Sequence, residues 1–405
     1  MPVWPCASSA WPRPWREAVS EPDPDGDSAL LWQGPLWRAG GVPSPTAVPG
    51  WPQEVDAAAE DFAAGAGPLP CAVVIDLTAY LPDAGLARIG ARIAGLAGEV
   101  PVVVLCAGDS PLAGLPRAHA IVEAAIPPDA LFRMLCALQR AILRAEEARI
   151  RRIVFGRLPD YGSAPHHQGT SGLLVVGLGR RFADLDDARR RNVEIVGAFT
   201  ADMAETYLSQ RAFDAAILDT SADEAAYLIE RILRDPRFAR LPILAFCDAW
   251  DDIAGLFRAG ANDVFHGAMT RETLAGRLAA AIRLGKRRRL ADRLLAESRI
   301  WLLRKAAAGG ISQSLYDAYL ARARQAVVAR GLDLAEMRLT TEAVEAASLA
   351  GDLAGTILSI ADATSREEDL VCAVEGRGPV AVFKNEQAGH RLRARIDAIL
   401  GRTAL

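Results

Sequence analysis

The chain has 405 residues, enough for about two to four domains, and its net charge of −4 excludes a strongly basic nucleic-acid-binding surface over the whole chain. No apolar run approaches the ~20 residues of a membrane span. The six cysteines are scattered, without a C-x-x-C pair, and several lie in apolar runs. This usage is typical of reduced core cysteines in a cytoplasmic protein.

Met1–Ser28 is rich in Trp, Pro and Asp and has no apolar signal core, so we expect a disordered lead-in or an upstream start that is not used. Over residues 29–150 short apolar runs alternate with amphipathic helices, which is typical of a parallel sheet. A linker with Gly, Pro and two His residues follows at 151–171, and the same order repeats over 172–292. Residues 293–405 form a third domain. Two copies of one five-stranded α/β unit are the simplest account of residues 29–292.

The expected strands of the first copy are Cys71–Asp76, Val100–Cys106 and Ala120–Val122, and those of the second are Leu173–Val176, Val193–Val196, Phe213–Asp219, Leu241–Cys247 and Gly260–Phe265. The expected helices include Leu86–Ala97, Pro128–Arg144 and Arg271–Leu295.

The second copy resembles a response-regulator receiver domain, and the first copy resembles it more weakly. The resemblance implies a flavodoxin-like, doubly wound fold with an aspartate phosphoacceptor at the end of strand three, which is Asp76 in the first copy and Asp219 in the second. Cys106 and Cys247 stand where the family has Thr or Ser, and Gly267 stands where the second copy would have Lys. The acid pair that holds Mg²⁺ after strand one is missing, so we interpret both aspartates as vestigial.

The third domain is organised around the R-x-x-D sequence Arg366–Asp369. Asp369 precedes the five-residue stretch Glu375–Pro379 by six positions, with one predicted strand before this turn, Leu370–Cys372, and one after it, Val380–Phe383. The pattern resembles a shortened, degenerate GGDEF domain of the diguanylate cyclases. The order receiver, receiver, GGDEF-like resembles the PleD/PopA-like response regulator family.

The signature carboxylates of a cyclase are missing here, because Arg377 and Gly378 occupy their positions. Gln313 and Ser314 replace the nucleotide-contacting Asn and Arg, and no metal-binding Asp is found near 337–343. Phosphoryl transfer needs metal ions to neutralise charge. We therefore expect no catalysis and no metal site.

The resemblance implies that Arg366 and Asp369 bind cyclic di-GMP, with Arg395 completing the site and Arg391 or Arg393 as close alternatives. An arginine offers a planar fork of donors to phosphate or guanine, and Asp accepts from guanine N–H groups. The R-x-x-D pattern occurs five more times in this arginine-rich chain, so its distance from the turn is what singles this copy out. Arg180 or Arg181 is expected to supply a cross-domain contact.

These observations predict a non-catalytic cyclic di-GMP effector, without cofactors, that forms a homodimer and recruits protein partners. The resemblance implies partners in cell-cycle-linked proteolysis at the cell pole. Two alternatives remain open: a scaffold that binds no nucleotide, and an atypical response regulator phosphorylated at Asp76.

Overall fold

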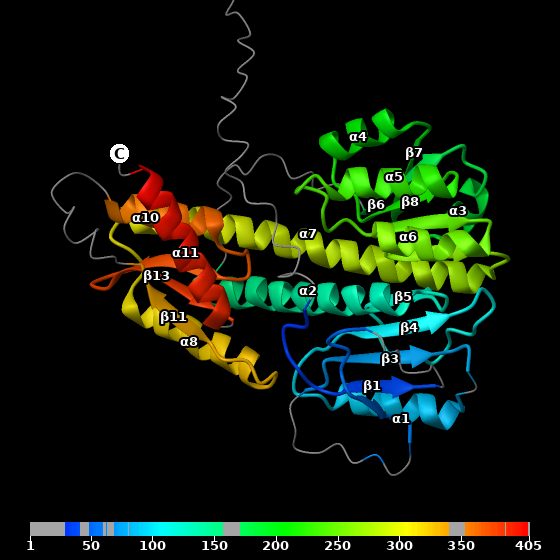
Figure 1. Cartoon of the computed structure of the whole chain (residues 1–405), viewed down its shortest axis with the longest axis horizontal. Helices are drawn as coiled ribbons and strands as arrows, with labels where there is room; N and C mark the ends of the chain where they lie inside the picture. Colours follow the sequence, from blue (N-terminus) through cyan, green and yellow to red (C-terminus); the bar gives the residue numbers. More distant parts are fainter. Residues whose placement is uncertain are drawn as a thin grey trace, which may run out of the picture.

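The computed structural model describes residues 29–40, 48–59, 62, 69–79, 81–156, 171–339, 353–384 and 386–403. The predicted lead-in, 1–28, lies outside these residues, as do 157–170 of the predicted linker and 340–343 of the stretch searched for a metal ligand. Figure 1 shows two α/β units at one end of the molecule and a smaller unit at the other, with the helices α2 and α7 running between them.

The first sheet domain is built on five parallel strands in the order β2-β1-β3-β4-β5. This is the flavodoxin-like order, as predicted. The central strands are buried along their whole length, as expected for a parallel sheet that is covered on both faces. Its elements are β1 (Leu36–Ala39), β2 (Glu54–Asp56), β3 (Ala72–Asp76), α1 (Asp83–Ala94), β4 (Val102–Cys106), β5 (Ala120–Glu123) and α2 (Pro128–Phe155).

The second sheet domain repeats the same order, β7-β6-β8-β9-β10, again with all strands parallel. Each predicted strand is present with shifted ends. Its elements are β6 (Ser171–Gly177), α3 (Phe182–Ala188), β7 (Val193–Ala198), α4 (Ala201–Gln210), β8 (Ala215–Asp219), α5 (Ala222–Leu233), β9 (Ile243–Cys247), α6 (Ile253–Ala259), β10 (Asp263–His266) and α7 (Arg271–Ala307).

Helices α2 and α7 are longer than predicted and pack side by side (Figure 1). The sequence prediction ends α2 at Arg144 and α7 at Leu295, whereas the helices continue to Phe155 and Ala307. Residues 151–155 of the predicted linker are therefore helical, and the predicted domain boundary at 292–293 falls inside α7. None of the helices in the described ranges is long and apolar enough to cross a membrane.

The two sheet domains pair within the chain through β5, β10, α2 and α7. At the centre of this contact Arg277 is 1% exposed. It donates from Nε to Asp263 at 2.8 Å and from Nη1 to Glu123 of the first domain at 3.3 Å. The Glu123 amide also donates to Asp263 Oδ1 at 2.9 Å. This charged cluster joins the two sheet domains of one chain. The homodimer expected from the sequence is a contact between two chains and stays a prediction.

The third domain has a three-stranded antiparallel sheet in the order β11-β13-β12. Alternate residues of β12 face opposite sides, as the two-residue period of a strand requires. One side packs on α8 and on Ile150 of α2 and Leu302 of α7, and the other packs on α10 and α11. Its elements are α8 (Gln313–Val328), β11 (Ala335–Arg338), α10 (Leu353–Thr364), β12 (Leu370–Val374), β13 (Gly378–Phe383) and α11 (Glu386–Thr403).

Candidate ligand site at the three-domain junction

The predicted hairpin is confirmed, because β12 and β13 pair antiparallel from Leu370↔Val382 to Val374↔Gly378. Its turn is open to solvent at Glu375 and Gly376. Arg377 folds back to pair with Glu336 of β11 and lies over the Tyr316 ring, 5.4 Å from its centroid. Across the described residues no group of three or more His, Cys, Asp or Glu side chains could hold a metal ion.

The R-x-x-D residues form a closed turn just before β12. The Arg366 amide donates to Asp369 Oδ2 at 3.3 Å, and the Asp369 amide donates to the Arg366 carbonyl at 3.1 Å. Asp369 is 7% exposed. Burial, reinforced by Glu368, raises the pKa of Asp369 to about 8, although Lys384 and Arg366 act in the opposite direction. The carboxyl group that was expected to accept from guanine is therefore turned into the protein.

Asp369 faces a small cavity between the third domain and the first sheet domain. The cavity volume is about 20 Å³, which has room for about one water molecule and not for a nucleotide base. Its lining residues come from the segment before β1, from α2, from the loop before β11 and from the hairpin: Leu31, Leu143, Leu332, Arg366, Glu368, Asp369 and Lys384.

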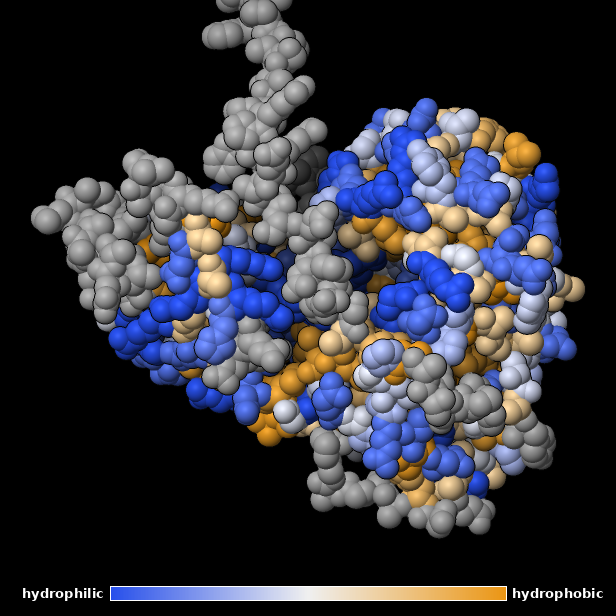
Figure 2. All heavy atoms as spheres, in the orientation of Figure 1, coloured by the Kyte–Doolittle hydropathy of each residue, from blue (hydrophilic) through white to orange (hydrophobic). Residues whose placement is uncertain are grey.

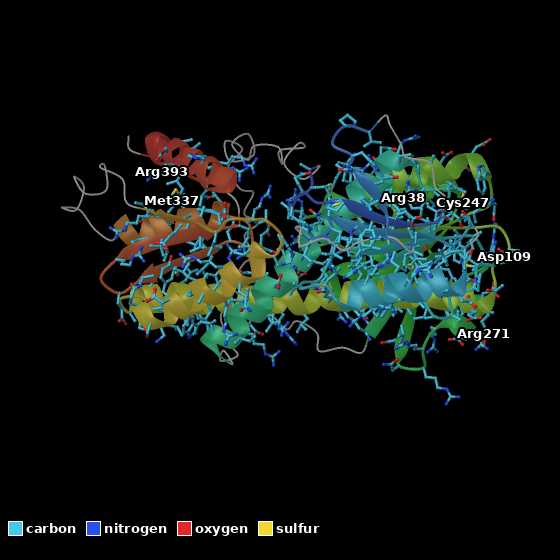
Figure 3. The ribbon with its side chains drawn as sticks, turned by 90° about the horizontal axis from the view of Figure 1, so that it is seen from below. Arg38, Asp109, Cys247, Arg271, Met337 and Arg393 are labelled. Atoms are coloured by element: carbon cyan, nitrogen blue, oxygen red, sulfur yellow. The ribbon has the colours of Figure 1, made fainter. Side chains whose placement is uncertain are left out.

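Arg395 lies near the R-x-x-D turn but on its solvent side. It is exposed on α11, and its Nη1 donates to the Thr364 carbonyl at 3.4 Å. Arg393, on the same helix, is also exposed and is labelled in Figure 3. Hydrophilic residues cover much of the visible third-domain surface around this helix in Figure 2. Arg395 therefore lies beside the turn on its solvent-exposed side, and it is not among the residues that line the cavity that Asp369 faces.

A buried charge network, which the sequence analysis missed, holds the base of the turn. Arg151 of α2 is 1% exposed. Its Nη2 donates to the Asp369 carbonyl at 2.7 Å and to the Glu367 carbonyl at 3.3 Å, and its Nη1 donates to Ser298 of α7 at 3.1 Å. Because Arg is always charged, this contact needs a buried counter-ion, and Glu147 supplies it at 2.7 Å.

Glu147 also binds the third domain directly. Lys384 Nζ at the end of β13 donates to Glu147 Oε2 at 2.6 Å, and the Tyr319 hydroxyl of α8 donates to Oε1 at 2.9 Å. Burial acts to raise the pKa of Glu147, but Lys384 and Arg151 together hold it below its usual value. An acid and a base four residues apart near the end of α2 were the available sequence signal.

The side chain of Glu367, inside the R-x-x-D turn, joins all three domains. It forms ion pairs with Arg144 of α2 and with Arg240, which precedes β9 of the second sheet domain; the Arg240 distance is 3.0 Å. Arg144 Nη1 also contacts Asp292 of α7 at 2.6 Å. Arg240, rather than the predicted Arg180 or Arg181, is thus a second-domain arginine that reaches this turn.

Asp76 and Asp219 end the central strands β3 and β8, as predicted. Asp76 is 4% exposed, and its Oδ1 accepts from the Thr78 amide at 2.9 Å and from the Thr78 hydroxyl at 2.7 Å. Asp219 accepts from the Arg181 amide at 3.2 Å. Arg181 also contacts Asp248 and the Phe246 ring, so these interactions stay inside the second domain.

The sheet edge with these aspartates lies far from the R-x-x-D turn. Cys106 and Cys247 end β4 and β9, and both are buried. In Figure 3, Cys247, the last residue of β9, and Asp109, which closely follows β4, are labelled at the end of the molecule opposite to Arg393. The structure does not bring Asp76 and Asp219, which the sequence predicts to be vestigial phosphoacceptors, together with the candidate ligand residues.

No protein-family model matches the sequence, and no curated protein matches it. Among solved structures, a response regulator from Chloroflexus aurantiacus is 20% identical, with a TM-score of 0.25 over 28% of this chain and 99% of that chain. An orphan response regulator of H. pylori is 16% identical, with a TM-score of 0.25 over 28% and 98% of the two chains. NtrX from Brucella abortus is 17% identical, with a TM-score of 0.27 over 39% and 41%. Likeness at this level carries no statement about activity, so the fold assignment rests on the strand order of the two sheets.

Proposed function

We propose that the chain is a non-enzymatic signalling adaptor in which two receiver-like domains hold a nucleotide-responsive third domain. The observation that carries the proposal is the position of the R-x-x-D turn, whose residues contact both sheet domains. A ligand that binds this turn would act on all three domains at once. The absence of carboxylates at the inner turn positions, Arg377 and Gly378, supports the non-catalytic part.

The ligand that we propose is cyclic di-GMP. Arg366 and the exposed Arg395 can each present a planar guanidinium to a phosphate or to a guanine edge. Asp369 can accept from the ligand when its carboxylate leaves the small cavity. Binding that uses Asp369 is therefore coupled to release of the third domain from the first, and the released surface is where we propose that protein partners bind, including those of cell-cycle-linked proteolysis.

The test is calorimetric titration of cyclic di-GMP into the full chain and into Arg366→Ala. We expect low-micromolar binding, about −8 kcal/mol, that the substitution removes. Arg234→Ala is the matched control, because it removes the same charge from a side chain that is 80% exposed at the C-cap of α5. Equal binding by wild type and Arg366→Ala would contradict the assignment of the site.

The second candidate function is a scaffold that binds no nucleotide. The burial of the Asp369 carboxyl group favours it, because a residue at 7% exposure in a cavity of about 20 Å³ also fits a purely structural role. Absence of heat and of any thermal shift at high cyclic di-GMP concentration, with an intact fold, would favour the scaffold.

A further inference from the structure

Arginines from both sheet domains gather where the third domain docks. Arg144 comes from α2, Arg288 and Arg289 come from α7, and Arg240 precedes β9. The Arg144 side chain is 5% exposed, and neither its Nε nor its Nη2 has a hydrogen-bond partner, although Nη2 lies within ion-pair distance of Glu367. Burial lowers the pKa of Arg144 to about 10, and the charge of Arg240 acts in the same direction. Burial, with Arg240 and Arg289, also lowers the pKa of Arg288.

Several guanidinium groups held together in a desolvated place repel one another and attract an anion. The anion that bridges two of them in this structure is Glu367, which pairs with both Arg144 and Arg240. Asp292 pairs with Arg144, and Asp214 pairs with Arg289 at 2.5 Å, so part of the charge is balanced inside the sheet domains. Glu367 differs from these acids because it belongs to the third domain.

We propose that Arg144 and Arg240 form an oxyanion site shared by the two sheet domains, that Glu367 fills it in this structure, and that a phosphate-bearing ligand competes with Glu367 for it. Glu367 then acts as an internal latch: while its carboxylate occupies the site, the third domain stays docked. The chemistry suits the competition, since an arginine fork binds carboxylate and phosphate oxygens in the same geometry. The side-chain exposures of 52% for Arg240 and 35% for Glu367 leave an approach from solvent.

This inference goes beyond the proposed function, because it concerns any phosphate oxyanion and does not require cyclic di-GMP or the guanidinium of Arg366. The probe is inorganic pyrophosphate, titrated at constant ionic strength so that general screening does not vary. The proteins are the full-length wild type, Glu367→Gln and Arg240→Ala. Glu272→Gln is the matched control, since it removes the same charge from an exposed side chain in the first turn of α7, far from this site.

Glu367→Gln removes the internal competitor, so we expect pyrophosphate to bind at least about fivefold more tightly than to wild type, the size of a partly exposed ion pair. Arg240→Ala removes part of the site, so we expect weaker binding than to wild type. Both variants should increase amide hydrogen exchange in the turn 366–369 and in β12. If the ion pair had a merely structural role, both substitutions would increase hydrogen exchange, but they would not shift the pyrophosphate affinity in opposite directions.

Binding to Glu367→Gln no tighter than to wild type, or equal to that of Glu272→Gln, would overturn the proposal. Should Glu367→Gln fail to fold, Arg240→Ala decides alone, because its half-exposed side chain can be removed without opening a core. Unchanged exchange and unchanged pyrophosphate affinity in Arg240→Ala would then refute the latch. Cyclic di-GMP binding is a separate outcome. It can be absent while the pyrophosphate affinities change as expected, and it can be present while they do not.

Discussion

At the scale of single residues, Asp369 gives the R-x-x-D turn its dependence on pH. Its carboxyl group is buried beside Glu368, and these surroundings raise its pKa to about 8, well above the ~3.9 of an unfolded chain. The folded protein therefore binds one proton more than the unfolded chain between these two values. By linkage, stability falls as pH rises through this window.

We expect Asp369→Asn to remove this part of the pH dependence. The variant keeps an oxygen acceptor for the Arg366 amide and carries no charge, so its Tm should fall less than that of wild type between pH 5 and pH 8.5, by about a few degrees. The measurement is thermal unfolding over that range.

Asp397→Asn, an exposed substitution on α11, is the control and should follow the wild-type curve. Parallel curves for wild type and Asp369→Asn would mean that Asp369 is ionised in the folded protein throughout this range, contrary to the burial argument.

The pattern of residues predicted the hairpin and the loss of turn carboxylates, but it could not predict where the Asp369 side chain points. That orientation depends on Arg151, which lies far away in the sequence and holds the turn, and on Lys384, which holds the end of the neighbouring strand. A motif defines which groups are near each other along the chain. The rest of the fold decides whether they face solvent, and here it places Asp369 inside and Arg395 outside.

At the scale of elements, apolar runs predicted the strands that are buried on both faces, such as β4 and β9. They missed β1, although all four residues of Leu36–Ala39 are buried, because an arginine interrupts this short run, and they missed β2, because Glu54–Asp56 is short, polar and half-exposed. They also underestimated α2 and α7. The first part of each helix packs on its own sheet domain, whereas the last part packs on the third domain, so the helical pattern changes face where the partner changes.

Helix α7 closely approaches the backbone of the second sheet domain at Gly285, where the chain has no room for a larger side chain. A Cβ atom at this position would lie 1.7 Å from the Asp214 carbonyl oxygen, which is backbone and cannot move aside cheaply. We expect Gly285→Ala to lower the free energy of unfolding by about 1–3 kcal/mol, as overpacking does, in spite of the better helix propensity of Ala. Chemical denaturation measures this change.

Gly255→Ala in α6 is the matched control, because nothing lies within 4 Å of its Cβ position. There the gain in helix propensity acts alone, so we expect a rise of about 0.5–1 kcal/mol. A Gly285→Ala protein as stable as Gly255→Ala would show that α7 can move away from the sheet without cost.

At the scale of the whole molecule, the sheet domains and the third domain are joined by buried charges rather than by apolar surface alone. The predicted repeat correctly identified two similar units, but the repeat itself carries no information on how they pack together. The residues that decide this are Arg277, Asp263 and Glu123. In the sequence each is an ordinary charged residue: Glu123 ends β5, Asp263 begins β10 and Arg277 lies in the second turn of α7. Their shared burial appears only when β5 and β10 lie side by side.

Arg277 should therefore be more important for domain pairing than any exposed arginine. Arg277→Met keeps the length of the side chain but leaves Asp263 and Glu123 buried without their cation, and we expect a loss of about 3–5 kcal/mol at pH 8. Burial already raises the pKa of Glu123 despite Arg277, and loss of the cation raises it further. Protonation then relieves the buried charge, so the loss of stability should become smaller as pH falls toward 5.

Chemical denaturation of wild type, Arg277→Met and the exposed control Arg234→Ala at both pH values measures this difference. A loss that is equal at pH 5 and pH 8 would mean that the missing contacts of the arginine side chain, rather than uncompensated carboxylates, destabilise the pair.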